Sequence, residues 1–350
     1  MTRSGVQFSL AAPAFLMILF SDIDPFETGQ LGVSDGHKLH WERCGKRGGV
    51  PIVFLHGGPG SGSVPAHRRF FDPELFDVLL FDQRGTGRST PKLSLVANDL
   101  DHQISDIEAL RSIMGVDRWI VMGPSWGSTL ALAYAQAHPD RVSGLLVEGV
   151  FLGTDTEIDW WHALDGAPRF FPDAFEPFVR AAPEAVRSSA AALRNWYLET
   201  MQEEWAAGAP ELQRLSDPSA SFETLRRSAL YRWTEYEDQL SWLAGSADIT
   251  RKSLAERGPD YVATHSLIEA HYFANRCFLE EGQLLADTDR LRNIPMQIIQ
   301  SRYDMVCPPC AAFDLAAACP HAEMALIPVN GHAMTDAVYP AVLSALNKLA

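Results

Sequence analysis

The chain has 350 residues and 47% hydrophobic content, enough to bury a large core, which excludes a disordered or fibrous protein. Its formal net charge of -15 argues against a nucleic-acid or anionic-membrane surface, so we expect neither partner. Five scattered cysteines in so long a chain do not form a disulfide framework, and we therefore expect a reducing, cytoplasmic location. Nothing in the sequence indicates an oligomeric state.

The amino end carries a short apolar run over residues 8–20, which is too short to span a bilayer. As a signal peptide it would have only Arg3 as a basic residue and no small-residue cleavage site after the run. Translation from Met17 is an equally good interpretation. We expect residues 1–21 to be an extension that is either not translated or disordered.

The first folded segments are predicted to be strands. Residues 31–44 place two strand-like segments around a Ser-Asp-Gly-His turn. Residues 51–55 form a continuous apolar run, as expected for a strand that is buried on both faces of a parallel sheet. The run ends in the loop HGGPG, residues 56–60, which lacks the patterns of phosphate-binding loops. Such a loop can instead offer a backbone N–H to an oxyanion.

Residues 76–81 predict a second buried strand, which leads into a charged, glycine-rich turn over residues 82–89. We interpret Asp82 and Arg84 of this turn as parts of a buried structural network rather than as catalytic groups. Residues 99–114 then predict an amphipathic helix, whose apolar stripe comprises Ile104, Ile107, Leu110, Ile113 and Met114.

Residues 118–132, RWIVMGPSWGSTLAL, run from an apolar strand through a G-x-S-x-G pattern into a helix. A serine on so sharp a turn has a strained backbone, which requires the small residues Gly123 and Gly127. The turn would raise the Ser125 hydroxyl above the sheet, where the helix start aims N–H groups, including that of Trp126, at it. A Gly/Ser turn without function is the alternative that five letters alone leave open.

The helix after this turn is expected to end near residue 138, and residues 142–150 predict another buried strand. Short apolar strands that alternate with helices predict an α/β fold with a mostly parallel, doubly wound sheet. Ligands of such sheets lie at the carboxyl ends of the strands. The HGGPG loop, Ser125 and Phe151 all fall there.

Strand signals are absent over residues 153–286, where aromatic residues and alanines are frequent and prolines interrupt the segments. We expect several helices, inserted between two strands as a cap over the carboxyl ends. The predicted organisation is therefore a core over residues 22–152 and 287–350 with a cap over residues 153–286.

The sheet is predicted to resume over residues 295–300, shortly before Asp304, and a last strand over residues 322–329 precedes His332. Either residue alone would more often be structural, but the order Ser, Asp, His at strand ends is that of the α/β-hydrolase fold. Cys307 and Cys310 spell C-x-x-C without the context of a redox or zinc motif, and we assign them no function.

These residues predict acyl transfer to water through an acyl-enzyme. His332 would remove the proton of Ser125, and Asp304 would fix the tautomer of the imidazole. The backbone N–H groups of Gly58 and Trp126 would bind the oxyanion. This chemistry requires no metal and no organic cofactor.

With these residues in place, the chain resembles the proline iminopeptidases (prolyl aminopeptidases) of the α/β-hydrolase fold. The likeness runs from about residue 22 to the carboxyl end, through SDGHKLHWERCG, VFLHGGPG, FDQRGTGRS, GPSWGSTLALAYAQAHPDRV, IEAHYFAN, SRYDMVCP and NGH. It implies a helical cap, the triad described above, and release of an amino-terminal proline from small peptides with a free amino terminus.

The resemblance also implies substrate-binding residues. Glu237, in WTEYE, and Glu269, in IEAHYF, match glutamates that hold the free amino group, and Phe151 and Phe273 match aromatic residues of the pyrrolidine pocket. Negative charge at a fixed distance from the nucleophile would let a protonated amino terminus measure one residue to the scissile bond. Without the resemblance, both glutamates would be interpreted as a solvated helix face.

Three positions depart from the family pattern. Pro124 stands where glycine is usual, Tyr236 replaces the second tryptophan of the cap motif, and Glu148 stands where arginine is typical. The reversed charge affects the prediction of proline specificity, because it alters the electrostatics near the nucleophile. Two alternatives therefore remain: a related hydrolase of esters, lactones or amino-acid amides, and a catalytically silent binding protein of the same fold.

Overall fold

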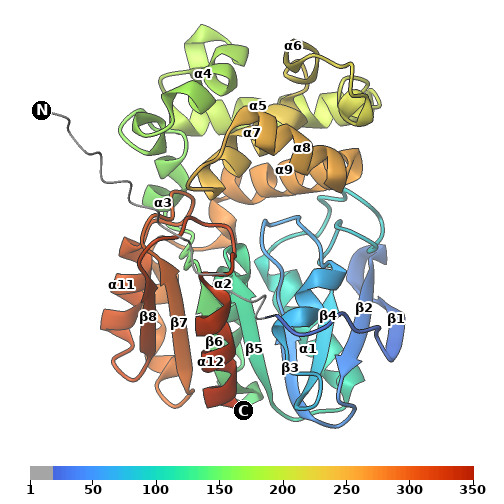
Figure 1. Ribbon diagram of the computed structural model, residues 1–350, viewed down its shortest axis with the longest axis vertical. Helices are drawn as coiled ribbons and strands as arrows, with labels where there is room; N and C mark the ends of the chain where they lie inside the picture. Colours follow the sequence, from blue (N-terminus) through green and yellow to red (C-terminus); the bar gives the residue numbers. More distant parts are fainter. Residues whose placement is uncertain (1–18) are drawn as a thin grey trace, which may run out of the picture.

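The computed structural model describes residues 19–350, so most of the apolar run over residues 8–20, with Met17, lies outside the described part. A central sheet carries helices on both faces, and further helices lie above one end of it (Figure 1). The strands of the sheet are β1 (Glu27–Gly32), β2 (Lys38–Gly45), β3 (Val50–Phe54), β4 (Phe76–Phe81), β5 (Trp119–Pro124), β6 (Val142–Glu148), β7 (Met296–Ser301) and β8 (Glu323–Ile327).

The eight strands lie in the order β1-β2-β4-β3-β5-β6-β7-β8. The hairpin of β1 and β2 pairs antiparallel, and so do β2 and β4, whereas every later neighbouring pair is parallel. The predicted α/β class with a mostly parallel, doubly wound sheet is therefore confirmed. A parallel strand needs a crossover connection, which places a helix between successive strands.

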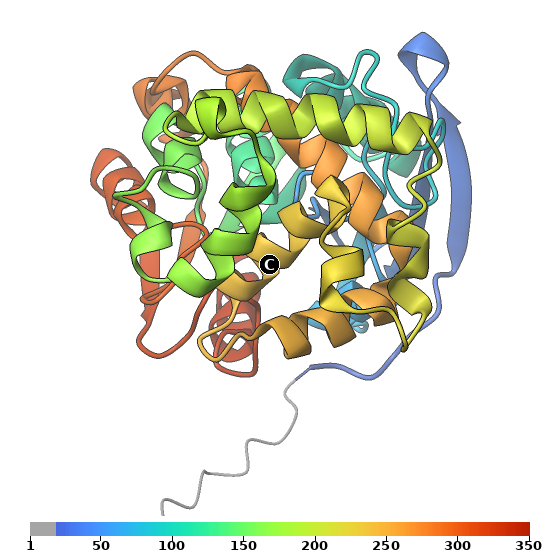
Figure 2. The same ribbon diagram turned by 90° about the horizontal axis from the view of Figure 1, so that it is seen from above.

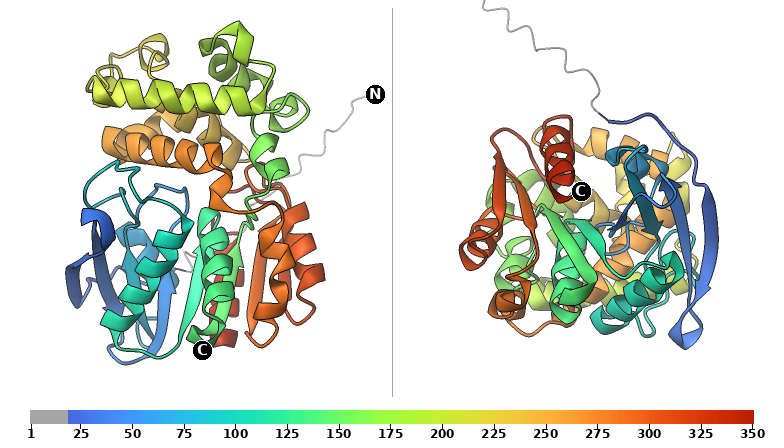
Figure 3. Two further views of the ribbon diagram at one scale, coloured as in Figure 1. Left: turned by 180° about the vertical axis from the view of Figure 1, so that it is seen from behind. Right: turned by 90° about the horizontal axis from the view of Figure 1, so that it is seen from below.

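Alternate residues of each central strand enter two different cores. In β4, Leu79 and Phe81 pack on one face, whereas Val78 and Leu80 pack on the other. The first face is covered by α1 (Leu100–Met114) and α2 (Trp126–Ala137), and the second by α12 (Tyr339–Leu349), as Figures 1 and 3 show. This two-sided burial explains the continuous apolar runs of the sequence.

Helix α1 begins where the sequence predicts, because the Asp99 side chain accepts a hydrogen bond from the backbone N–H of His102 at 3.0 Å. One member of the predicted stripe is wrong: Ile113 is 39% exposed. At 3.6 residues per turn, Ile113 lies about half a turn around the helix from Ile104 and points to solvent.

The turn after β4 is a buried polar network, as the sequence indicates. Asp82 accepts hydrogen bonds from Ser63 and Arg88, and the Arg84 guanidinium forms two hydrogen bonds to Asp106 at 2.7 and 2.8 Å. Neither Asp82 nor Arg84 is among the residues that line the pocket of Ser125. Both side chains position the neighbouring loops instead.

A layer of helices lies over the carboxyl ends of the strands, between β6 and β7 in the chain (Figures 1 and 2). Helices α7 (Ala229–Ser241) and α9 (Pro259–Ala274) lie between the sheet and the long helix α5 (Ala190–Ala206). The last of the inserted helices, α10 (Gln283–Ala286), packs against α2 and α11 (Cys310–Ala318). The bounds of core and cap stay a prediction. The inserted helices are α3 (Asp155–Trp160), α4 (Pro172–Ala181), α5 (Ala190–Ala206), α6 (Phe222–Leu225), α7 (Ala229–Ser241), α8 (Ala247–Arg257), α9 (Pro259–Ala274) and α10 (Gln283–Ala286).

Within residues 19–350, no helix has both the length and the apolar character that a membrane crossing requires.

Candidate active site

Ser125 occupies the sharp turn between β5 and α2. Its φ of 55° and ψ of -128° lie in a backbone region that residues other than glycine rarely adopt. A Cβ on Gly123 would lie 2.0 Å from the carbonyl oxygen of Gly127, and a Cβ on Gly127 would lie 2.1 Å from that of Leu55. Both glycines are therefore required by close backbone packing, which holds the serine in its strained conformation.

The structure brings Ser125, His332 and Asp304 together. The Ser125 Oγ lies 3.0 Å from His332 Nε2, and His332 Nδ1 lies 2.8 Å from Asp304 Oδ2. With Nδ1 protonated, the imidazole donates to the carboxylate and can accept the serine proton at Nε2. This is the geometry that a serine nucleophile and its base require.

Asp304 is itself held by the backbone. Its Oδ1 accepts hydrogen bonds from the N–H groups of Val306 and Cys307 at 2.9 and 2.7 Å. Burial lowers the pKa of His332, but the Asp304 carboxylate and the Cys307 side chain raise it by more, so that it stands well above its ordinary value. The carboxylate thereby stabilises the imidazolium that forms when the serine loses its proton.

The HGGPG loop lies against the turn of Ser125. A Cβ on Gly57 would lie 3.4 Å from the Ser125 Cβ, and Gly57, Gly58 and Ser125 line one pocket. In the described part of the chain, no group accepts a hydrogen bond from the backbone N–H of Gly58 or Trp126. Both donors are therefore available to an oxyanion beside Ser125.

Gln83 ties this loop to the turn of Ser125. Its side-chain amide donates to the carbonyl oxygen of His56 at 2.9 Å, and its Oε1 accepts from the indole N–H of Trp126 at 3.0 Å. All three side chains are buried. The turn after β4 therefore sets the distance between the two predicted oxyanion donors.

Glu237 of α7 and Glu269 of α9 meet above the nucleophile. Glu237 lines the pocket of Ser125 and His332, and Glu269 lies directly behind it, with its Oε2 accepting from the indole N–H of Trp233 at 2.6 Å. The Oε1 of Glu269 is buried and has no partner. The two glutamates are buried, not solvated, so their interpretation as an exposed helix face is wrong.

His265 joins the two glutamates and was missed by sequence reasoning. Its Nε2 contacts the Glu237 carboxylate and lies 3.8 Å from Glu269 Oε2, while its Nδ1 lies 3.1 Å from the Ser61 Oγ. The spacing of four residues between His265 and Glu269 was the available signal, since it places both on one helix face.

Donor atoms of these three residues all lie within 4.8 Å of one another, a spacing that could hold a metal ion. The expectation that no metal or cofactor is needed stays a prediction.

The pKa values of the two buried glutamates shift in opposite directions. Burial would raise the pKa of Glu237, but the His265 imidazole lowers it by more, and it stands below its ordinary value. Burial and then the Glu237 carboxylate raise the pKa of Glu269 well above its ordinary value. The surroundings therefore favour the ionised form of Glu237 and the protonated form of Glu269.

Phe151, just after β6, packs against Phe273 of α9. Their ring centroids are 5.7 Å apart, and the ring of Trp161 packs edge-on against Phe273 at 5.3 Å. Phe273 is one helical turn beyond Glu269 on α9, so the aromatic cluster adjoins the buried carboxylates.

Tyr236 has a packing role in the cap. Its ring stacks on Phe178 at 4.8 Å, and its hydroxyl donates to the carbonyl oxygen of Trp161 at 2.7 Å. It is buried, and it does not line the pocket of Ser125. This departure therefore affects the packing of the helices above the site and leaves the pocket wall unchanged.

Glu148 lies at the end of β6, opposite Pro124 in the sheet, and its backbone oxygen accepts a hydrogen bond from Ser125 N at 2.8 Å. Its side chain is buried, and Oε1 has no hydrogen-bond partner. Burial raises the pKa of Glu148 to about 8. At neutral pH the side chain is therefore mostly protonated, so the negative charge expected beside the nucleophile is largely absent.

Cys307 and Cys310 are free thiols, one buried and one exposed. Burial raises the pKa of Cys307 to about 12, so this thiol is not a thiolate near neutral pH.

The fold and this arrangement define an α/β hydrolase. The family model of the alpha/beta hydrolase fold matches residues 50–335. A hydrolase of this fold from Bacillus anthracis str. Sterne superposes with a TM-score of 0.59 and 16% identity over 93% of this chain and 99% of that one. An esterase from Exiguobacterium antarcticum superposes with a TM-score of 0.55 and 16% identity, over 91% of this chain and 98% of its own. At this identity the likeness concerns the fold.

Relatives in sequence are closer. A proline iminopeptidase from Arabidopsis thaliana is 39% identical over 94% of this chain and 81% of its own length. A probable proline iminopeptidase from Leptolyngbya boryana is 40% identical over 94% of each chain. A proline iminopeptidase from Neisseria gonorrhoeae is 35% identical over 93% of this chain and 98% of its own length. The chain belongs to the proline iminopeptidase family, which confirms the resemblance seen in the sequence motifs.

The buried carboxyl of Glu148 should make stability depend on pH. In the unfolded chain it ionises near its ordinary pKa of 4.5, whereas in the folded chain it stays protonated up to about 8. Wild-type stability therefore falls as pH rises through this window, at up to about 1.4 kcal/mol per pH unit. Glu148→Gln removes this loss, and its free energy of unfolding relative to wild type should rise by roughly 3 kcal/mol between pH 4.5 and pH 7.

Urea denaturation of both proteins at several pH values measures this difference. Glu203→Gln, at an exposed glutamate of α5, is the matched control and should show no such trend. A difference between Glu148→Gln and wild type that stays constant from pH 5 to pH 8 would show that Glu148 is ionised in the folded protein.

Proposed function

We propose that the protein is a serine aminopeptidase that releases an amino-terminal proline from small peptides. Ser125 is the nucleophile, His332 is the base and Asp304 orients the imidazole. The observation that carries this proposal is the buried Glu237 in the wall of the pocket of Ser125, with Glu269 buried behind it and joined to it through His265. An endopeptidase or a lipase has no use for a buried negative charge at this place, whereas a protonated amino terminus needs one.

In the first step, the Ser125 oxygen attacks the carbonyl carbon of the proline residue while its proton passes to His332 Nε2. The tetrahedral oxyanion accepts hydrogen bonds from the N–H groups of Gly58 and Trp126, each worth about 3 kcal/mol to the transition state. The imidazolium then donates its proton to the leaving nitrogen as the C–N bond breaks. This step leaves a prolyl ester on Ser125 and frees the shortened peptide.

In the second step, water attacks the ester. His332 takes a proton from the water, the same two N–H groups bind the second oxyanion, and the proton returns to the Ser125 oxygen as proline departs. The enzyme ends in its initial state, and the residues of this chain supply every proton transfer.

Recognition of the substrate falls to the cap. The ionised Glu237 and the protonated Glu269 would accept hydrogen bonds from the secondary ammonium of proline, and Phe151 and Phe273 would enclose the pyrrolidine ring. The Oε1 of Glu269, buried without a partner, would gain one in the complex. Because the anchored nitrogen belongs to the residue that is released, the site measures one residue from the amino terminus.

Ser125→Ala should lower kcat by roughly 10⁵-fold or more, because the variant has no oxygen to form the acyl-enzyme. It should also abolish labelling by a fluorophosphonate probe, since the probe bonds to the nucleophile. Turnover of proline 4-nitroanilide and gel fluorescence of the labelled protein measure the two effects. Labelling that persists in the variant would remove Ser125 from the mechanism.

The need for a free amine is tested with three substrates: proline 4-nitroanilide, its N-acetylated form and a short-chain 4-nitrophenyl ester. We expect acetylation to lower kcat/KM by at least roughly 100-fold, because it removes the charge that the glutamate pair binds. Equal rates with and without acetylation would overturn the aminopeptidase proposal and leave a hydrolase of esters, lactones or amides.

Glu269→Gln should weaken use of proline 4-nitroanilide far more than use of the ester, by about ten-fold or more in kcat/KM. The reason is that glutamine has one acceptor oxygen, so it cannot accept from both the Trp233 indole and the substrate ammonium, whereas the triad stays intact. Glu203→Gln is the control for loss of a carboxylate and should leave kcat/KM unchanged for both substrates. An equal loss on anilide and ester would argue against the role of Glu269 as an amine anchor.

A further inference from the structure

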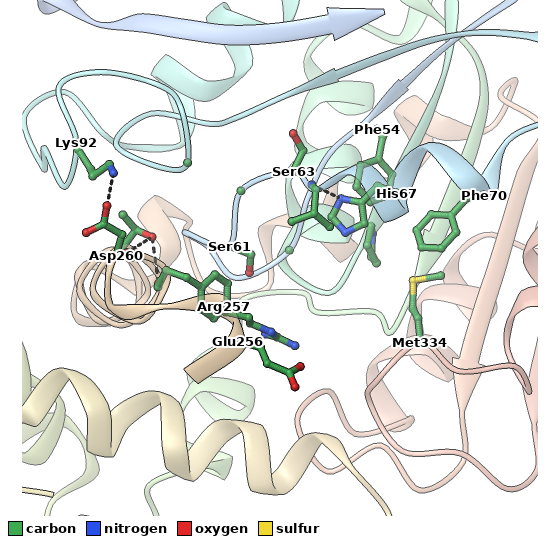
Figure 4. A pocket seen from close by; sticks show the side chains of 17 residues that line it. Phe54, Ser61, Ser63, His67, Phe70, Lys92, Glu256, Arg257, Asp260 and Met334 are labelled. Atoms are coloured by element: carbon green, nitrogen blue, oxygen red, sulfur yellow. Dashed lines mark hydrogen bonds and ion pairs between the residues drawn. The ribbon is translucent and has the colours of Figure 1, made fainter. Parts of the chain in front are cut away.

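A second, larger cavity adjoins the pocket of Ser125, and Figure 4 shows the side chains that line this cavity. Its volume is about 680 Å³, against about 180 Å³ for the pocket of Ser125. The two hollows are adjacent, because four residues line both of them: Gly57, Ser61, Arg257 and Tyr261. The larger cavity has no role in the chemistry described so far, although it begins beside the reacting serine.

Helix α9 runs past both hollows, and successive parts of the helix contribute residues to each of them. Glu269 and Phe273 lie toward its carboxyl end, whereas Tyr261 and Thr264 lie toward its amino end and line the larger cavity. His265 lies between them and contacts Ser61 of the glycine-rich loop. At about 1.5 Å per residue, Tyr261 and Glu269 are roughly 12 Å apart along the axis, which is the length of a short peptide.

If the amine binds at Glu237 and Glu269, the part of the substrate beyond the scissile bond has to lie on the other side of Ser125. The larger cavity is the hollow that borders the nucleophile's pocket there. This step rests on the proposed function, because the amine site sets the direction of the peptide.

One wall of the cavity is apolar. Phe54 and Phe70 pack with their ring centroids 6.0 Å apart, the His67 ring lies 4.7 Å from Phe54, and Met334 faces them (Figure 4). Burial raises the energy of a charged imidazole, and the pKa of His67 is lowered to about 3, so this ring is neutral. The wall therefore suits an apolar or aromatic side chain.

The opposite wall presents Arg257, the last residue of α8. Its guanidinium lies over the Tyr261 ring, 4.8 Å from the centroid, and Nη1 donates to the Tyr261 hydroxyl at 2.7 Å. Within residues 19–350, no carboxylate lies within 4.0 Å of this guanidinium, whereas Lys92 of the same cavity is paired with Asp260 at 2.6 Å. Arg257 is thus held in position with donors to spare.

Four carboxylates lie around this cation. Glu237 lines the pocket of Ser125 together with Arg257 and is in contact with His265. Asp260 is paired with Lys92, and Asp238 accepts a hydrogen bond from Thr250 at 2.8 Å. Glu256 lines the cavity next to Arg257, and because both side chains are exposed, solvent screens their attraction. Arg257 remains the cation that can form a direct, bidentate hydrogen bond with an entering carboxylate.

We propose that the larger cavity binds the second residue of a dipeptide substrate and that Arg257 binds its free α-carboxylate. The substrate class is a dipeptide with an amino-terminal proline and an apolar or aromatic second residue. In a dipeptide the carboxylate lies one residue beyond the scissile bond, and Arg257 lines both the pocket of Ser125 and the cavity. A blocked carboxyl terminus loses this charge-assisted contact.

The test compares kcat/KM for prolyl-phenylalanine and for prolyl-phenylalaninamide, which differ in the terminal carboxylate. Wild type should prefer the acid, and the ratio of acid to amide should fall about ten-fold in Arg257→Met. Arg257→Lys keeps the charge and should keep part of the preference. Lys252→Met is the matched control, because it removes a positive charge from an exposed position of the same helix; its ratio should equal that of wild type.

An acid-to-amide ratio that is the same in Arg257→Met and wild type would overturn the role of Arg257. A fall of the same size in Lys252→Met would also overturn it, since the effect would then come from net charge. Turnover of proline 4-nitroanilide by wild type distinguishes a failure of the proposed aminopeptidase function from a failure of the proposed role of Arg257. If wild type fails on this substrate, the proposed function fails; if it succeeds and the ratio does not respond to Arg257, only the proposal on the cavity fails.

Discussion

The site depends on one steric constraint, the contact of the Gly127 Cα with the carbonyl oxygen of Leu55. No side chain fits there, since a Cβ would lie 2.1 Å from that oxygen. The contact brings the start of α2 against the end of β3, and so brings the turn of Ser125 against the glycine-rich loop. Gln83 then holds the glycine-rich loop and the turn of Ser125 together through buried hydrogen bonds to His56 and Trp126. Backbone packing therefore positions Ser125, the proposed nucleophile, and the proposed oxyanion donors Gly58 and Trp126.

Two electrostatic environments meet at the site. Beside Ser125, the Asp304 carboxylate favours a protonated His332, which the proposed proton transfer requires. In the helices above, Glu237 and Glu269 form the buried acidic pair that we propose to bind the ammonium group of the substrate. Glu148 lies near the first environment and would disturb it if ionised, but burial keeps the side chain mostly neutral near pH 7. Where the sequence motifs led us to expect arginine, the chain therefore lacks a positive charge rather than carrying a negative one.

The turn of Ser125, the strands and the order of the triad could be predicted from the sequence, because each depends on local patterns such as glycine spacing and apolar runs. His265 was missed, since its partners Ser61 and Glu237 are remote in sequence and only the packing of α7, α9 and the loop brings them together. The protonation of Glu148 was missed for the same reason, as burial is a tertiary property. Ile113 was misplaced because the assumed apolar stripe was too wide for the geometry of the helix.

Helix α9 carries residues of both proposed subsites. Glu269 and Phe273 belong to the proposed amine and proline site, and Tyr261 and Thr264 line the cavity proposed for the second residue. The helix packs on Gly60 so closely that a Cβ on that glycine would lie 2.5 Å from the Thr264 oxygen. The two proposed subsites thus use different side chains but are both positioned by α9. Substitutions at one end can retune a subsite without moving the nucleophile, whereas a displacement of the whole helix would misalign both subsites at once.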